Sequence, residues 1–246
     1  MRGAFWFAAG VAAVVFVRLT TVQGQGDCMP LPGHPGAVVC GVKVASGGHV
    51  ALAAPLEGAA TVETILADAL ATPLPTPNMR APLPTWLPAG VLGHEAEIRS
   101  AAAEAGLDPL ALAILVAIEC PSGNAGCTSY VGARGIAQIM PATASSLELQ
   151  TGFPCTSQAH DPLTSLRCGS AYYIQGLRAA APLWELGREA DAIGAAGIGY
   201  NGGNGLVPRV VAHVQGGGAV CEAPVPAESR RWCSMATDMW RKAGRQ

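Results

Sequence analysis

The hydrophobic and polar positions after residue 93 follow a helical rather than a strand-like period. The pattern predicts helices over residues 94–105, 109–120, 141–147, 161–180, 189–198, 208–215 and 227–242. Short segments with Gly, Pro or polar residues separate these helices, and no strand-like alternation of any length appears among them. This part of the chain is therefore predicted to form a mainly α domain.

The predicted helix over residues 109–120 is apolar on every side, which indicates that it is buried. Asp108 and Pro109 form a strong start signal, because the Asp side chain caps free amides and Pro suits the first helical position. Glu119 lies at the other end, where burial and the helix dipole both raise the pKa of its carboxyl. A carboxyl that stays protonated near neutral pH suits general acid catalysis. A glutamate that simply reaches solvent where the helix stops is the alternative.

The first residues of the chain have the pattern of an export signal. Arg2 precedes an apolar run over residues 3–17, and residues 22–24 provide a small-residue cleavage site. The run is short for a membrane-spanning helix, yet Arg18 directly after it also fits a retained signal-anchor. Residues 1–24 are therefore a cleaved signal peptide or a membrane anchor. Either one predicts a periplasmic, cell-envelope or extracellular location for the rest of the chain.

Residues 25–71 form a small extension rich in Pro, Gly and Ala, to which we assign no role. Two Val-containing runs, residues 37–45 and 49–53, flank Ser46-Gly47-Gly48 and predict a β-hairpin. Repeated prolines over residues 72–93 predict an extended, semi-rigid linker.

The composition excludes several classes of protein. Of the 246 residues, 50% are apolar and 13% are charged, which excludes disorder driven by charge. The net charge of −2 gives no argument for nucleic-acid binding. The glycines after Asn201 are not a phosphate-binding loop, since no Lys-Ser/Thr follows them. We expect no nucleic-acid partner, no cofactor and no metal.

Eight cysteines in a chain with an export signal predict disulfides. Nearest-neighbour bonding gives the pairs Cys28–Cys40, Cys120–Cys127, Cys155–Cys168 and Cys221–Cys233. Eight cysteines allow on the order of a hundred pairings, so this one is a hypothesis. The competing idea is a metal site of Cys28, His34, Cys40 and His49, but these residues lack the usual zinc-ligand spacing. If the last pair is bonded, it ties residues 216–246 to the domain through a helix with an apolar face.

Four segments lie in order between residues 94 and 215: AEAGLDPLALAILVAIEC, GARGIAQIMPATA, DPLTSLRCGSAYYIQGL and IGYNGG. Together they resemble the catalytic domain of the soluble lytic transglycosylase family, the lysozyme-like enzymes that cleave peptidoglycan glycan strands. The resemblance implies a lysozyme-like fold with Glu119 as the catalytic residue. It also places Gln138, Tyr200, Asn201 and Ser129 in the substrate-binding cleft, and the Tyr200 phenol could hydrogen-bond the Glu119 carboxyl.

Three residues depart from the family pattern. Cys120 stands where the family usually has Ser, Ala137 where it has Met, and Gly199 where it has Ala. The first departure removes a hydroxyl beside Glu119. It is the only argument for an inactive, wall-binding relative of these enzymes.

The activity that the resemblance implies needs one carboxyl. Glu119 first protonates the oxygen between N-acetylmuramic acid and N-acetylglucosamine, and then acts as base while the muramic 6-hydroxyl closes a 1,6-anhydro ring. A hydrolytic lysozyme is the closest rival, with Asp161 or Asp191 as the second carboxylate. The expected partners are peptidoglycan glycan strands. The setting is open between wall remodelling, a secretion or conjugation machine, and a phage particle.

Overall fold

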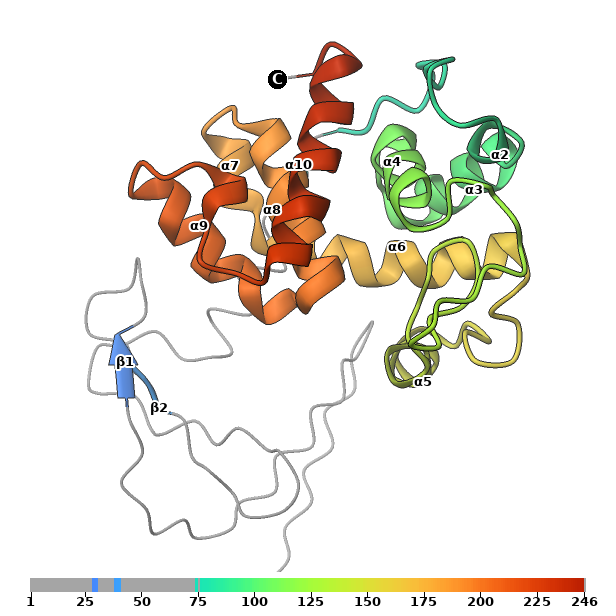
Figure 1. Ribbon diagram of the computed structural model, residues 1–246, viewed down its shortest axis with the longest axis horizontal. Coiled ribbons are helices and arrows are strands. Elements are labelled where there is room, and N and C mark those ends of the chain that lie inside the picture. The colour runs from blue at the N-terminus through green and yellow to red at the C-terminus, as the bar shows by residue number, and fades with distance from the viewer. Residues whose placement is uncertain (1–27, 31–37, 41–73, 75, 246) are drawn as a thin grey trace, which may run out of the picture. The chain divides into compact units, whose positions relative to one another are not determined.

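The computed structural model describes residues 28–30, 38–40, 74 and 76–245 (Figure 1). The chain divides into two units, residues 1–62 and 63–246. In the first unit, strand β1 (Cys28–Pro30) pairs antiparallel with strand β2 (Val38–Cys40), with Cys28 opposite Cys40. β2 lies inside the first predicted strand run.

Several predictions for this unit concern residues outside the described ones. They are the export signal, the turn at residues 46–48 and the partner run at residues 49–53. The predicted Cys28–Cys40 disulfide depends on side chains that are also outside the description. These features stay predictions.

The second unit is built from helices, so the fold is mainly α, as the sequence predicts. Its α-helices are α2 (Ala89–Leu92), α3 (Glu95–Ala105), α4 (Pro109–Glu119), α5 (Pro141–Thr151), α6 (Pro162–Ala179), α7 (Ala181–Glu185), α8 (Glu189–Gly202), α9 (Val207–Gln215) and α10 (Ala227–Lys242). Two short 3-10 helices follow α8 and α9: η1 (Asn204–Leu206) and η2 (Val220–Glu222). Within the described residues, no helix is long and apolar enough to cross a membrane.

Local sequence signals set several of these helix ends. The Asp108 side chain accepts a hydrogen bond from the Leu110 amide at 2.9 Å, and α4 begins at Pro109. Asp161 caps α6 in the same way, through the Thr164 amide. Gly106 ends α3 in the left-handed conformation with φ 68°. α8 continues past its predicted end, so Tyr200 and Asn201 lie in its last turns rather than after it.

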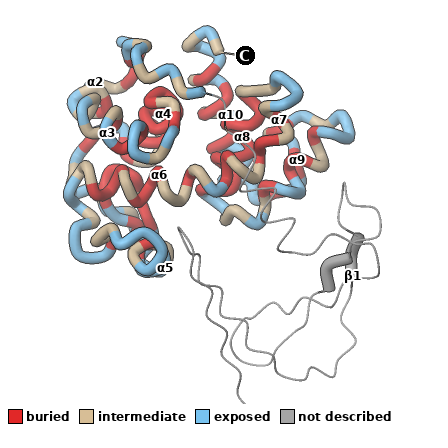
Figure 2. The backbone as a smooth tube through the Cα atoms, turned by 180° about the vertical axis from the view of Figure 1, so that it is seen from behind, coloured by how far each residue is buried: buried red, intermediate tan, exposed pale blue. Residues whose placement is uncertain are grey.

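Helix α4 is buried along most of its length (Figure 2). Its residues 112–116 are fully buried, as expected for a helix that is apolar on every side. α3 and α10 contact α4, α6 contacts α3 and α8, and α8 contacts α10. Each buried leucine or isoleucine contributes about 1.5–3 kcal/mol before conformational entropy is counted.

The described part of the predicted Pro-rich linker is packed on the helices, which corrects the expectation of a spacer. Leu83, Leu87 and Val91 are buried in the same core as α4. The Arg99 guanidinium of α3 donates hydrogen bonds to the carbonyl oxygens of Met79 and Ala81, both at 2.8 Å. The prolines keep this segment extended, and the apolar residues between them fix it to the domain.

Helix α10 lies along α8 and also contacts α4 (Figure 1). Gly194 and Gly197 of α8 allow this close approach. A Cβ built on Gly194 would lie 2.8 Å from the Cys233 sulfur, and one built on Gly197 would lie 1.9 Å from the Trp232 ring. The Cys221–Cys233 disulfide joins α10 to the segment before it.

Candidate functional site

Glu119 is partly buried at the carboxyl end of α4. The indole Nε1 of Trp232, on α10, donates a hydrogen bond to Glu119 Oε1 at 2.7 Å. Loss of water around the carboxyl raises the pKa of Glu119 from 4.5 to about 7, the Trp232 hydrogen bond opposes this rise, and the negative charge of Glu228 adds to it. The carboxyl can therefore both give and take a proton near neutral pH.

Two tyrosine rings from two helices pack against the Trp232 indole, which is the hydrogen-bond donor to this carboxyl. The Trp232 ring centroid lies 6.4 Å from that of Tyr173 on α6 and 6.3 Å from that of Tyr200 on α8. Tyr172 packs on Tyr200 at 5.5 Å. These contacts fix the plane of the indole, and with it the direction of its N–H.

The expected hydrogen bond from Tyr200 to Glu119 is absent from the structure. The Tyr200 hydroxyl donates instead to the carbonyl oxygen of Ala137 at 2.6 Å. Burial, and then the nearby Glu119 charge, raise the pKa of Tyr200 well above its ordinary value, so the phenol stays neutral. Trp232 takes the place expected for Tyr200, because its N–H reaches the carboxyl from the neighbouring helix.

Asn201 lies in the last turn of α8, with an exposed side chain. Its Oδ1 accepts a hydrogen bond from the hydroxyl of Ser229 at 2.8 Å. Ser229 is buried at the start of α10. This contact ties the end of α8 to the beginning of the helix that carries Trp232.

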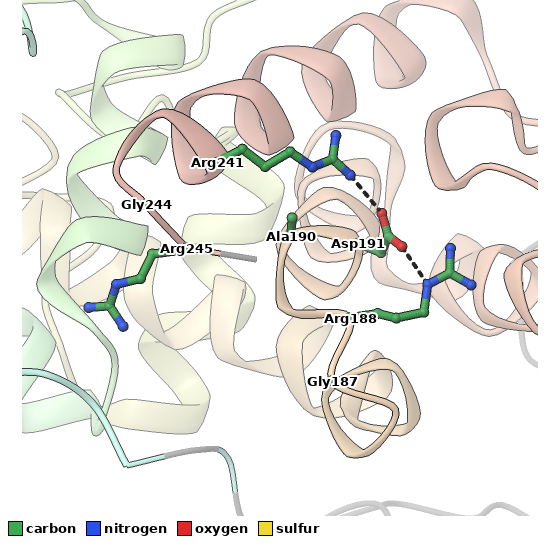
Figure 3. A pocket seen from close by; sticks show the side chains of 7 residues that line it. All are labelled: Gly187, Arg188, Ala190, Asp191, Arg241, Gly244 and Arg245. Carbon is green, nitrogen blue, oxygen red and sulfur yellow. Dashed lines mark hydrogen bonds and ion pairs between the residues drawn. The ribbon is translucent and has the colours of Figure 1, made fainter.

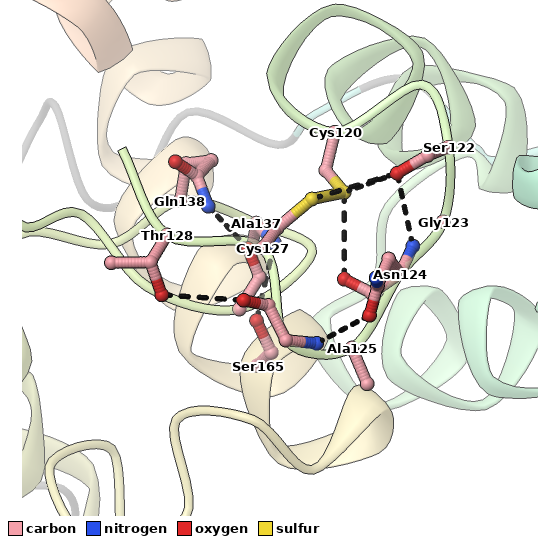
Figure 4. The surroundings of a disulfide bond; sticks show 12 residues. Cys120, Ser122, Gly123, Asn124, Ala125, Cys127, Thr128, Ala137, Gln138 and Ser165 are labelled. Carbon is pink, nitrogen blue, oxygen red and sulfur yellow. Dashed lines mark hydrogen bonds between the residues drawn. A yellow bond between two sulfur atoms is a disulfide. The ribbon is translucent and has the colours of Figure 1, made fainter. Parts of the chain in front are cut away.

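Gln138 and Ser129 lie in one loop that follows Glu119. Figure 4 shows Gln138 in this loop. Gln138 has a positive φ of 49°, and its Nε2 donates to the carbonyl oxygen of Gly135 at 2.7 Å. The Ser129 hydroxyl oxygen accepts from the Ala133 amide at 3.0 Å. Both side chains therefore brace their own loop, which leaves the Gln138 carbonyl oxygen as the amide atom for a ligand.

Three of the four predicted disulfides are present, and they are the three whose side chains are described. They are Cys120–Cys127, Cys155–Cys168 and Cys221–Cys233. The first closes the start of the loop directly after Glu119 (Figure 4). Cys120 is 1% exposed and bonded, so it offers no free thiol beside the carboxyl.

The two carboxylates expected for a lysozyme are committed elsewhere. Asp161 caps α6, and its hydrogen bonds from Thr164 lower its pKa. Asp191 is ion-paired with Arg188 at 2.6 Å and with Arg241 at 3.2 Å (Figure 3). Arg241, the partner of Asp191, lies about 14 Å along α10 from Trp232, the partner of Glu119, so Asp191 is at the other end of this helix. The carboxylate whose charge does act on Glu119 is that of Glu228, which raises the pKa of Glu119.

The Asp191 carboxylate lines a hollow at the beginning of α8 and the end of α10. The lining residues are Gly187, Arg188, Ala190, Asp191, Arg241, Gly244 and Arg245. Arg245 also pairs with Asp108 at 2.9 Å. The arginines of this hollow therefore hold the ends of three helices together. Across the described residues, no group of three or more His, Cys, Asp or Glu side chains is arranged to hold a metal ion.

Sequence reasoning missed Trp232 and Glu228 as site residues. Trp232 lies on the predicted last helix, whose apolar face is expected only to pack on the domain, and no role is expected for Glu228. Trp232 lies 113 positions after Glu119. The signal available in the sequence was their four-residue spacing, which places both on one face of α10.

The family model and the curated relative that match this chain are both transglycosylases. The family model described as "Transglycosylase SLT domain" matches residues 97–218. A transglycosylase of Enterobacteria phage PRD1 is 39% identical over 88 residues, which are 36% of this chain and 30% of that protein. An inactive mutant of the lytic transglycosylase Slt from Pseudomonas aeruginosa superposes with a TM-score of 0.47 at 22% identity. That match covers 62% of this chain and 25% of the Slt chain. The chain thus spans less than a third of either relative's length.

Proposed function

Residues 97–218 belong to the transglycosylase SLT family, and from this we propose that the chain is a peptidoglycan lytic transglycosylase. It cleaves the β-1,4 bond between N-acetylmuramic acid and N-acetylglucosamine and leaves a 1,6-anhydro-muramic end. The single observation that supports this best is Glu119, whose burial raises its pKa to about 7. One group can then act first as acid and then as base.

In the first step, the protonated Glu119 gives its proton to the glycosidic oxygen as the bond from that oxygen to the anomeric carbon breaks. In the second step, the Glu119 carboxylate takes the proton of the muramic 6-hydroxyl as that oxygen bonds to the same anomeric carbon. The carboxyl returns to its starting state, and no water is consumed. A pKa near the working pH makes both transfers accessible.

The loop and the end of α8 supply the proposed substrate contacts. Because Gly135 holds the Gln138 amide nitrogen, the Gln138 carbonyl oxygen is free to accept from the N–H of an N-acetyl group. Because Ser229 holds the Asn201 oxygen, the Asn201 amide nitrogen can donate to a sugar. We assign a third contact to the Ser129 hydroxyl. Tyr200 acts indirectly, by holding the Ala137 carbonyl next to Gln138.

We place the catalytic domain at residues 94–215 and propose that the chain acts outside the cytoplasm, exported or anchored through residues 1–24. Its setting is the cell envelope or a phage particle. The phage relative named a transglycosylase is the argument for the second. Wall remodelling and assembly of a secretion or conjugation machine are the other proposed roles.

A hydrolytic lysozyme is the second candidate function, and Glu228 is the observation that favours it. Its charge lies close enough to raise the pKa of Glu119. Hydrolysis needs a second carboxylate near the acid to activate water or to act as nucleophile. The two functions differ in product, because hydrolysis leaves a reducing muramic end.

Mass spectrometry of digested peptidoglycan tests the proposal. We expect 1,6-anhydro-muropeptides from the wild type and a loss of at least about a thousandfold in Glu119→Gln. Glu185→Gln is the matched control, since Glu185 is an exposed glutamate at the end of α7. Reducing ends in place of anhydro ends would support the lysozyme. No cleavage by any variant would support an inactive, wall-binding protein.

A further inference from the structure

Helix α10 lies outside the region matched by the family model, which ends at residue 218. It is nevertheless fixed against the candidate site. The Cys221–Cys233 disulfide ties its first half to the preceding segment, and Ser229 bonds Asn201 at the end of α8. Gly197 leaves the space that the Trp232 indole fills. The first two turns of α10 therefore have a defined position relative to Glu119.

Trp232 has the geometry of a positioning residue rather than of a packing residue alone. It is 3% exposed, its ring packs against Tyr173 and Tyr200, and its N–H is directed at Glu119 Oε1 at 2.7 Å. Packing alone does not require this direction. The indole nitrogens of Trp184 and Trp240 are also buried, yet they have no hydrogen-bond partner among the described residues.

We propose that α10 sets the proton balance of Glu119 through two residues one turn apart. Trp232 orients the carboxyl through its hydrogen bond to Oε1 and stabilises the carboxylate that remains after proton transfer, whereas Glu228, four positions earlier on the same face of α10, contributes a negative charge that opposes this carboxylate. This inference rests on the proposed function in taking Glu119 as the acid and base. It adds a control element that the SLT-matched region does not contain.

The tyrosines near Glu119 are neutral, so Trp232 and Glu228 are the two residues that act on its protonation in opposite directions. From α8, Tyr200 feels the charge of Glu119 but remains neutral, because burial raises its pKa. From α6, Tyr173 remains neutral for the same reason. Within the described residues, Glu228 is the charged group that shifts Glu119, and Trp232 is the hydrogen-bond donor that shifts it in the other direction.

Two substitutions are therefore expected to move the titration of Glu119 in opposite directions. Trp232→Phe keeps an aromatic ring but removes the N–H, so the carboxylate loses its donor and the midpoint rises by about one pH unit. Glu228→Gln removes a nearby negative charge, so the midpoint falls by roughly a few tenths of a pH unit, since Glu228 is exposed and screened. Carbon-13 NMR of labelled glutamate side chains measures both shifts, with Glu119→Gln assigning the signal.

The wild-type protein provides a measurement that does not depend on any variant folding. The indole N–H signal of Trp232 should move with the same midpoint as the Glu119 carboxyl, and that movement should vanish in Glu119→Gln. The indole signals of Trp184 and Trp240 are the internal controls. The proposal would be overturned if the Trp232 indole signal did not change as Glu119 titrates, or if the Glu119 midpoint were unchanged in Trp232→Phe.

Enzyme kinetics then separate this proposal from the function on which it rests. If Glu119 is the catalytic acid, the alkaline limb of the pH–rate profile should move to higher pH in Trp232→Phe and to lower pH in Glu228→Gln. If the NMR midpoints move and the cleavage profiles do not, the role of α10 stands and the catalytic assignment of Glu119 is wrong. Loss of all cleavage in Glu228→Gln, with reducing ends in the wild type, would make Glu228 the second carboxylate of a hydrolase.

Discussion

The Trp232 indole occupies the space where a side chain at Gly197 would be. A Cβ built on Gly197 would lie 1.9 Å from Cζ3 and 2.0 Å from Cε3 of Trp232. The backbone of α8 is helical at this position, so the glycine is required by the indole above it and not by a left-handed conformation. The position of Trp232, which bonds Glu119, thus depends on α8 having a glycine, with no Cβ, at residue 197.

Gly197→Ala should therefore displace Trp232 and act on the candidate site from a distance. Over-packing of this kind costs about 1–3 kcal/mol, and we expect cleavage to fall further than stability alone explains. Thermal unfolding and muropeptide release measure the two effects. Gly205→Ala is the control, because nothing lies within 4 Å of its built Cβ. Equal melting temperatures for Gly197→Ala and wild type would contradict the packing argument.

The pKa of Glu119 also predicts how stability depends on pH. In the folded chain this pKa is raised from 4.5 to about 7, so between these values the folded state holds a proton that the unfolded state has lost. The contribution of Glu119 to stability is fully present below pH 4.5 and is lost as the pH rises to about 7.

Glu119→Gln lacks this titration, so the difference between the two proteins isolates it. The variant should gain about 1–3 kcal/mol relative to wild type between pH 4 and pH 8. Urea unfolding at a series of pH values measures the difference, and effects common to both proteins cancel. A constant difference across this range would show that Glu119 is solvated like an ordinary glutamate.

The Cys120–Cys127 disulfide provides a third prediction. Cys120→Ser with Cys127→Ser should destabilise the chain by about 2 kcal/mol, the chain-entropy value for so short a loop. Cleavage should also fall, because the same loop carries Ser129 and Gln138. Urea unfolding and muropeptide release measure the two effects.

Cys155→Ser with Cys168→Ser is the control for this pair, since it opens another local loop, of separation 13 against 7, at α6. It should lower stability while cleavage is retained below the melting temperature. Equal losses of cleavage in the two double variants would show that the first disulfide acts only through global stability.

Much of the domain could be predicted from the sequence because its signals are local. Asp108 and Asp161 cap the helices that they precede, and Gly106 ends α3. The apolar sequence of residues 109–119 specifies a buried helix wherever it is placed. Short cysteine separations made nearest-neighbour pairing geometrically accessible, and three of the four pairs are present.

The relationships between helices could not be predicted in this way. Hydrophobic periodicity and helix caps do not specify which helix α10 packs against, so the hydrogen bond from Trp232 to Glu119 could not be predicted. The Tyr200 phenol could donate either to the Glu119 carboxyl or to a backbone carbonyl, and in the packed domain it donates to Ala137. Residues 72–93 are predicted to be a linker, because prolines indicate extended backbone whether or not the leucines between them pack on the domain; Leu83 and Leu87 do pack on it.

Deletion of residues 219–246 is the strongest test of the dependence on α10. The deletion removes the buried Trp232 and Trp240, each worth about 1.5–3 kcal/mol of apolar burial. It also uncovers Gly194 and Gly197 of α8 and leaves the Glu119 carboxyl without its donor and open to water. We therefore expect a clear fall in melting temperature together with a return of the Glu119 pKa toward its ordinary value.

The double variant Cys221→Ser with Cys233→Ser keeps the helix and removes only its covalent tie. It should fall between wild type and the deletion in melting temperature, and should retain the Trp232 indole signal that follows Glu119. Calorimetry and the NMR titration measure both properties. A truncated chain of residues 1–218 with unchanged melting and unchanged cleavage would show that the SLT-matched region is sufficient and that α10 is an appendage.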